Sequence, residues 1–341
     1  MPTATLRNVA GPMRGALILL TCLAVLPPVR PASGAAAQAP APSGEVARHV
    51  DRVGLMRDVT TLSGREFEGR GTGTPGGLRA RSWIVDQFRA IGVEPGGTDG
   101  YAQPFTVTAR SVRDILPGGR PFQTRLAGAN VVARLPGRDP RAATIVITAH
   151  YDHLGVQDGL VYPGADDNAS GVAVLLASAR HFATTPPRHA LIFAALDAEE
   201  PGLHGARALV GSALLSRAPV ALNVNLDMVA RSASNEIFAA GTYHSPWLAP
   251  ILLDVQHRAA VRIRFGHDRP EAGGSGLDDW TLESDHGVFH QAGIPFVYFG
   301  VEDHPDYHRP TDTADRIDPR FFGDAADMIV EALRTFDARL P

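Results

Sequence analysis

The sequence contains one cysteine and no lysine, so that all 32 of its basic side chains are arginines. Without lysine, the chain has no P-loop lysine, no Schiff base with pyridoxal phosphate and no Ser–Lys dyad. A lone thiol, Cys22, excludes a disulfide framework and cysteine-ligated zinc or iron–sulfur sites. Positive charge is also scarce: 36 acidic residues leave a net charge of −4, which disfavours nucleic-acid binding.

The first 37 residues have the layout of a secretory signal peptide. Arg7 and Arg14 precede an apolar run of 11 residues from Ala16 to Leu26, and three alanines follow at 35–37. Such a run is too short to span a bilayer, which needs about 20 residues, and the small residues offer a cleavage site. We therefore predict a signal peptide over 1–37, and a secreted or periplasmic protein with no stable membrane span after cleavage.

Two alternatives for this segment are an uncleaved anchor and a lipid anchor on Cys22, although Thr21 is larger than the residue that usually precedes a lipidated cysteine. Residues 38–44 (QAPAPSG) have the composition of a flexible tether. Cleavage after Ala37 would leave 304 residues without cysteine. It would remove three arginines and no acid, so that 36 acids against 29 arginines give a net charge of −7.

Residues 45–341 are predicted to form a single α/β domain. No internal repeat or linker-like stretch divides them, and short apolar, β-branched runs alternate with segments of helical periodicity. Continuous apolar strands between helices favour a three-layer sandwich, in which helices flank a mostly parallel central sheet. The predicted strands are 130–135, 144–149, 190–196, 221–226, 236–240 and 295–300, and the predicted helices are 45–62, 77–91, 170–183, 203–215, 247–259 and 319–336.

Side chains that bind metals follow four of these strands. Each cluster alone is ambiguous, since Asp-Asp-Asn before a helix is typical of a cap. In a parallel sheet, however, the strand ends converge, and so many charges are costly to place together unless a cation compensates them. Mixed imidazole and carboxylate ligands favour zinc, and their number favours two ions that share one carboxylate. The candidates are His150, Asp152, Asp166, Asp167, Glu199, Glu200, Asp227, His304 and His308.

The segments HYDHLG, GADDNASG, DAEE, NLDM and YH, in that order, resemble the M28 family of zinc aminopeptidases over roughly residues 56–335. The linked series is specific to the family, whereas any single motif is not. The resemblance implies a site with two zinc ions, in which Asp167 bridges the ions because it directly precedes Asn168 of the family's turn. The other implied metal ligands are His150, Glu200, Asp227 and His308.

The resemblance also implies three catalytic roles. Glu199 would be the general base, acting on a water that bridges the metals, and Asp152 would hold the imidazole of His150. In an extended segment, residues two apart point the same way, which agrees with that role for Asp152. Tyr307 would donate to the tetrahedral oxyanion, with simple packing as the alternative.

Other polar residues are given less specific expectations. Residues 284–289 (SDHGVF) match a further family motif and are expected to form the pocket wall and to contact the ligands without binding metal. His153, His204 and His304 receive no role and are expected to be structural or solvent-facing.

The expected function is that of a dinuclear zinc aminopeptidase, which hydrolyses N-terminal residues from peptides. A carboxypeptidase or dipeptidase of the same clan is one alternative, and it should present a basic group such as Arg231 or Arg264 to the substrate carboxylate. A glutaminyl cyclase, with the same fold and a single zinc, is another, and a receptor ectodomain that has lost its ligands is a third. The complete ligand set favours the aminopeptidase, and the sequence does not indicate an oligomeric state.

Overall fold

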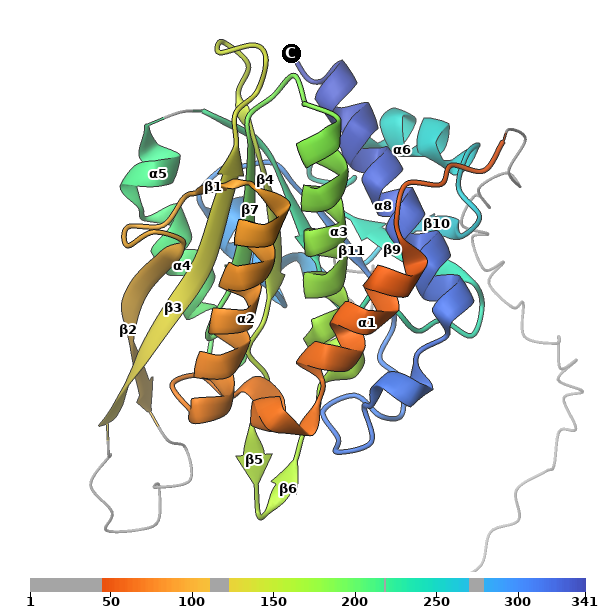
Figure 1. Ribbon diagram of the computed structural model, residues 1–341. Helices are drawn as coiled ribbons and strands as arrows, with labels where there is room; N and C mark the ends of the chain where they lie inside the picture. Colours follow the sequence, from red (N-terminus) through yellow and green to blue (C-terminus); the bar gives the residue numbers. More distant parts are fainter. Residues whose placement is uncertain (1–44, 111–122, 218, 270–278) are drawn as a thin grey trace, which may run out of the picture. The chain divides into compact units, whose positions relative to one another are not determined.

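The computed structural model describes residues 45–110, 123–217, 219–269 and 279–341. The predicted signal peptide (1–37) and tether (38–44) lie outside the described residues. A nine-stranded sheet forms the centre of the domain, and a two-stranded hairpin, β5 (Val156–Gln157) and β6 (Leu160–Val161), lies apart from it (Figure 1). The strands of the central sheet are β1 (Glu94–Pro95), β2 (Ala102–Arg110), β3 (Gln123–Leu135), β4 (Thr144–His150), β7 (Leu191–Leu196), β8 (Val220–Leu226), β9 (Glu236–Ala240), β10 (Arg262–Phe265) and β11 (Phe296–Gly300).

The middle of the sheet is parallel. Its order is β1-β3-β7-β4-β8-β11-β9-β10, with β2 paired to β3, and the four strands from β7 to β11 in this order run in the same direction. His150 at the end of β4 is paired with Leu196 at the end of β7, and Leu226 at the end of β8 is paired with Phe299. The carboxyl ends of these four strands therefore meet at one edge, where open α/β sheets form their binding sites.

Helices cover both faces of this sheet (Figure 1). Along β4, Ile145 and Ile147 pack with five helices on one face, and Val146 packs with α4 and α7 on the other, as expected for alternating side chains in a strand. Every residue of β4 is consequently buried. The first face carries α1 (Arg52–Leu62), α2 (Pro75–Ile91), α3 (Gly171–Thr184), α6 (Leu248–Gln256) and α8 (Pro319–Arg339), and the second carries α4 (His204–Val210) and α7 (His286–Gln291).

The predicted fold class, a three-layer α/β sandwich in one domain, is confirmed, but several boundaries were predicted wrongly. The helix predicted over 45–62 begins at Arg52, because the side chain of Asp51 caps its first turn by accepting from the backbone N–H of Val53. The helix predicted over 203–215 divides into α4 and a short α5 (Ala213–Ser216). The structure adds β2, β10 and α7, which the prediction lacked. None of the helices in the described ranges has both the length and the apolar character needed to cross a membrane.

The segment before α1 is held against α8 by buried carboxylates. One oxygen of Asp327 accepts from the backbone N–H groups of His49 and Val50, at 2.6 and 3.0 Å. Its other oxygen accepts from the guanidinium groups of Arg48 and Arg52, at 3.2 and 2.7 Å. Because Asp327 is only 2% exposed, the two backbone donors depend on a carboxylate that water hardly reaches, while both arginines also donate to Asp324.

We predict that Asp327→Ala lowers the free energy of unfolding by about 3 kcal/mol, because it leaves two backbone N–H groups without their acceptor and removes one of the two carboxylates that bind Arg48 and Arg52. Urea denaturation followed by circular dichroism measures this change. The matched control is Asp86→Ala, which removes an exposed ion pair with Arg89 and should cost less than about 0.5 kcal/mol. Equal effects of the two substitutions would contradict the importance of this anchor.

Candidate metal centre

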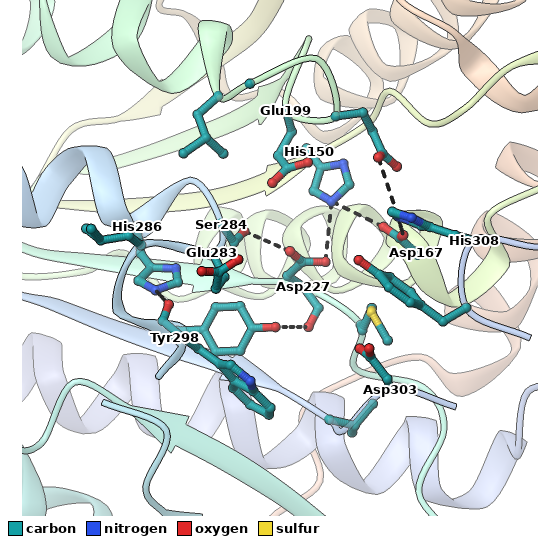
Figure 2. Close-up of a pocket in the computed structure, with 18 residues that line it drawn as sticks. His150, Asp167, Glu199, Asp227, Glu283, Ser284, His286, Tyr298, Asp303 and His308 are labelled. Carbon is teal, nitrogen blue, oxygen red and sulfur yellow. Dashed lines mark hydrogen bonds and ion pairs between the residues drawn. The ribbon is translucent and has the colours of Figure 1, made fainter. Parts of the chain in front are cut away.

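Five loops at the carboxyl edge of the sheet bring the predicted ligands to one cavity of about 340 Å³ (Figure 2). His150 is the last residue of β4, and Asp227 directly follows β8. Glu200 lies four residues beyond β7, and His308 lies on the loop after β11. Asp167 belongs to a turn, Ala165–Ser170, that leads into α3. The side chains of all five residues line the cavity together with Glu199 and Tyr307.

The first group of candidate ligands consists of His150, Asp167 and Asp227. Nε2 of His150 lies 3.3 Å from Oδ1 of Asp227 and 3.4 Å from Oδ1 of Asp167. Ligands about 2.0–2.1 Å from a tetrahedral zinc ion are about 3.3 Å from one another. The three residues are buried and within reach of a common ion, so their spacing fits a metal such as zinc.

The second group uses the other oxygen of Asp167. Nε2 of His308 lies 3.0 Å from Oδ2 of Asp167 and 3.4 Å from Oε2 of Glu200. These separations also fit the spacing of zinc ligands. Since Oδ1 of Asp167 faces His150 and Oδ2 faces His308, this one carboxylate can contribute to both groups (Figure 2).

His153 belongs to the same cluster, although the sequence analysis gave it no role. Its side chain is completely buried, and its Nδ1 lies 2.7 Å from Oε1 of Glu200 and 3.7 Å from Oδ2 of Asp167. The expectation of a merely structural or solvent-facing position is therefore incomplete. The available signal was its place three residues after His150, in the stretch that directly follows β4.

The charges of the cluster are strongly coupled. Burial alone would raise the pKa of Asp167, but the neighbouring imidazoles of His153, His150 and His308 lower it well below its usual value. Burial lowers the pKa of His150, but the carboxylates of Asp227 and Glu199 outweigh it and raise that pKa. Burial raises the pKa of Asp227 as well. Carboxylates packed this closely favour any positive charge nearby, whether a proton or a metal ion.

The turn that carries Asp167 is fastened on two sides. The carboxylate of Asp312 accepts from the backbone N–H groups of Asp166 and Asp167 at 3.1 Å. The side chain of Asn168 donates to the carbonyl of Leu226 at 2.9 Å and accepts from the N–H of Gly171. Asn168 thereby ties the turn to the end of β8, next to Asp227. Figure 2 shows the carboxylates of Asp167 and Asp227 on either side of the same space.

Arg70 holds the segment that leads into this turn through hydrogen bonds to backbone carbonyls. Its guanidinium is fully buried and donates to the backbone carbonyls of Leu62, Tyr151, Pro163 and Gly164 at 2.5–2.9 Å. Burial lowers the pKa of Arg70 to about 10, against the opposing effect of nearby carboxylates, so that the group remains cationic at neutral pH. A fixed positive charge therefore lies close to the turn that carries Asp167.

Asp152 lies next to His150, as predicted, but its carboxylate has closer partners on another loop. Nδ1 of His150 contacts the backbone carbonyl of Asp152 at 3.1 Å, whereas the carboxylate of Asp152 is 3.8 Å away from it. The alternation argument does not apply because β4 ends at His150. The carboxylate instead accepts from the backbone N–H groups of Glu199 and Glu200, at 3.0 and 3.3 Å. It thus holds the turn that presents both glutamates.

The wall of the cavity includes Ser284 and His286 of the predicted segment 284–289, whereas the other four residues of that segment do not line it. The hydroxyl of Ser284 donates to Oδ2 of Asp227 at 2.7 Å, and His286 contacts the carbonyl of Trp280 at 2.8 Å (Figure 2). Tyr307 is half-buried and stacks on His308 with ring centroids 3.9 Å apart. Burial and the nearby carboxylates raise the pKa of Tyr307, which keeps its hydroxyl protonated and able to donate.

The remaining candidates turn away from the metal cluster. Asp166 accepts from the N–H of Ala230 at 2.8 Å through Oδ1, while its Oδ2 faces Nε2 of His304 at 3.3 Å. His204 begins α4 and is partly exposed. Asp166 and His304 therefore contribute to the support of the loops around the cavity.

Comparison with known proteins gives a consistent result. The model of peptidase family M28 matches residues 130–333. A probable zinc metalloprotease from Pyrenophora teres f. teres is 29% identical over 255 residues, which cover 64% of this chain and 50% of the relative. The chain thus spans about half the length of this curated relative.

Solved structures share the fold. A zinc aminopeptidase from Bacillus subtilis matches with a TM-score of 0.66 and 18% identity, over 85% of this chain and 95% of the other. A glutaminyl cyclase from Porphyromonas gingivalis matches with a TM-score of 0.64 and 18% identity, over 84% and 99% of the two chains. The family match covers more than half of the sequence and includes every candidate ligand, and the chain therefore belongs to peptidase family M28.

Proposed function

We propose that the protein is a dinuclear zinc aminopeptidase, which removes N-terminal residues from peptides. The observation that carries this proposal is the arrangement around Asp167, whose two oxygens face two separate pairs of a histidine and a carboxylate. Zinc is favoured by the mixture of imidazole and carboxylate ligands. The name of a curated relative, a probable zinc metalloprotease, supports the same metal.

In this proposal, His150 and Asp227 hold one ion, His308 and Glu200 hold the other, and Asp167 contributes to both. When bound, two such ions supply Lewis-acid polarisation of the scissile carbonyl and make a water more acidic. The protein's own task is to fix the ligands. Ser284 donates to Asp227 and restrains it. Asp152 accepts from the N–H of Glu200 and so restrains the turn that bears this glutamate.

Glu199 is the proposed general base. It lines the cavity beside His150 without belonging to either group of ligand spacings (Figure 2). Burial, followed by the repulsion of neighbouring carboxylates, raises its pKa well above the usual value. A carboxylate of raised pKa accepts a proton from the attacking water and passes it to the departing amine. Tyr307 is the proposed hydrogen-bond donor to the oxyanion.

The surroundings of the cavity favour an aminopeptidase over a carboxypeptidase. Of the described residues, no arginine lines the cavity. Arg231 pairs with Asp306 at 2.8 Å, and Arg264 pairs with Glu236 at 3.1 Å. Both candidates for binding a substrate carboxylate are thus engaged elsewhere, whereas the acidic lining suits the positive charge of a free α-amine.

A free α-amine should be required for cleavage. We predict that leucyl-nitroanilide and a short unblocked peptide are hydrolysed, and that acetylating their N-termini lowers kcat/KM at least 100-fold, because the blocked amine no longer offers a positive charge to the acidic lining. Release of nitroaniline and chromatography of the peptide products provide the measurement. Cleavage of acetylated peptides at their C-terminal residue would instead indicate a carboxypeptidase.

The two adjacent glutamates should behave differently when mutated. Glu199→Gln keeps the shape of the side chain but cannot accept a proton, so we predict that kcat falls by about 10²–10⁴ while zinc content stays at the wild-type value. Glu200→Gln removes a charged ligand and should lose zinc as well as activity. Elemental analysis and kcat are measured on both variants side by side. The opposite pattern would mean that the two roles are interchanged.

We also propose that the protein acts outside the cytoplasm, which rests on the layout of residues 1–37. Intact mass measurement of the native protein should give a chain that starts near Gln38. The double substitution of Ala35 and Ala37 by Phe should block cleavage, because the processing enzyme needs small residues there. An unprocessed Met1 in the wild-type protein would contradict cleavage, and a lipid on Cys22 would indicate membrane anchoring.

A further inference from the structure

We propose that His153 is a positioning residue for the second metal ion: its Nδ1–H donates to Oε1 of Glu200 and so aims Oε2 of the same carboxylate at the ion. This inference rests on the proposed two-ion site. It gives a role to a histidine that lies outside the ligand set expected from the sequence. The two oxygens of Glu200 then have separate duties, one in a hydrogen bond and one in metal binding.

The distances around Glu200 are consistent with these duties. Nδ1 of His153 is 2.7 Å from Oε1 of Glu200, which is the length of a strong hydrogen bond to a carboxylate. Nε2 of His308 is 3.4 Å from Oε2 of Glu200 and 3.0 Å from Oδ2 of Asp167. Those separations bracket the value of about 3.3 Å expected between two ligands of one zinc ion. Nδ1 of His153 also lies 3.7 Å from Oδ2 of Asp167, and His153, Asp167 and Glu200 form a group within reach of one ion. The short contact of 2.7 Å favours the hydrogen-bonding position for His153, and burial and the tautomer decide between the two histidines.

Burial supports the same assignment. The side chain of His308 is 38% exposed and lines the cavity, whereas that of His153 is fully buried and is not among the residues lining it. An ion that also contacts substrate must border the cavity. The ring of His153 lies behind that of His308, with centroids 5.7 Å apart, so that it can support the site without facing the substrate.

The tautomer of His153 gives a further reason. Among the described residues, Nε2 of His153 has no hydrogen-bond partner, and it is buried. If Nδ1 bound the metal, Nε2 would have to carry the hydrogen, which would leave a buried N–H donor unsatisfied. If Nδ1 carries the hydrogen and donates to Glu200, Nε2 is only an acceptor without a donor. The second arrangement avoids the buried, unpaired donor.

The role predicts an effect confined to one ion. Partners that orient a metal ligand typically change metal affinity by about 10–100-fold. His153 contacts Glu200, which belongs to the second group, and makes no hydrogen bond to His150 or Asp227 of the first. Removing its donor should therefore weaken binding of the second ion and leave that of the first nearly unchanged.

The test is a zinc titration of the full chain against a competing chelator, with metal content per chain measured at each free-zinc concentration. Wild type should bind two ions. We expect His153→Ala to bind the second ion about 10–100-fold more weakly, with the first ion changed less than about twofold. His153→Asn should restore most of the affinity, because its amide N–H₂ lies near the position of Nδ1 and cannot replace an imidazole ligand. The control is His189→Ala, which removes a buried histidine that precedes β7 and contacts the carbonyl of Ala143, away from the cavity, and should leave both affinities unchanged.

The outcomes separate this inference from the proposed function. Two ions in wild type with equal loss in His153→Ala and His153→Asn would make His153 a metal ligand and overturn the positioning role. Unchanged affinity in both variants would overturn it as well. A wild-type protein that binds a single ion would contradict the two-ion site itself and this inference with it. If His153→Ala does not fold, His153→Leu, which fills much of the buried volume but has no donor, provides the same comparison with His153→Asn and should lose the second ion to the same extent.

Discussion

The concentration of carboxylates at the carboxyl edge of the parallel strands is the constraint on which the rest of this structure depends. Asp152, Asp167, Asp227 and Asp285 are buried there beside Glu199, and burial raises the pKa of three of the aspartates and of the glutamate. Placing such groups together is unfavourable unless hydrogen bonds or cations compensate for the lost water. The loops around this edge supply some of the hydrogen bonds that compensate the carboxylates. The imidazoles and carboxylates that face the cavity could bind a cation, which would supply the rest.

Backbone groups and one arginine provide the compensation that the chain itself contains. The N–H groups of Glu199 and Glu200 bind Asp152, and those of the metal-binding turn bind Asp312. Arg70 adds a buried cation whose five N–H donors, fixed in a plane, suit several carbonyls at once. These contacts join α1, the strand ends and the turn before α3. The interactions that stabilise the buried carboxylates therefore also fix the geometry of the candidate ligands.

Much of this organisation could be predicted because it depends on local sequence. His150 and Asp227 were found from their places at strand ends, and the parallel sheet followed from apolar strands between helices. The role of His153 was missed because its partner, Glu200, lies 47 residues away on another loop. The partners of Arg70 are backbone carbonyls of three separate segments. Since every residue has such a carbonyl, the pattern of side chains in the sequence could not predict these contacts. The role of Asp152 was implied by the family resemblance, and the alternation that supported it does not hold because β4 ends at His150, two residues earlier.

The same charge balance links metal binding to the stability of the loops. Asp285 is fully buried and, within the described residues, neither of its oxygens has a hydrogen-bond partner, and burial raises its pKa to about 7. When ionised, Asp285 adds to the negative potential that Asp227 and Glu199 create near His150. This potential favours a cation at the first group of candidate ligands. A cation held there lowers the energy of every carboxylate around it, and part of its binding free energy therefore stabilises the folded loops.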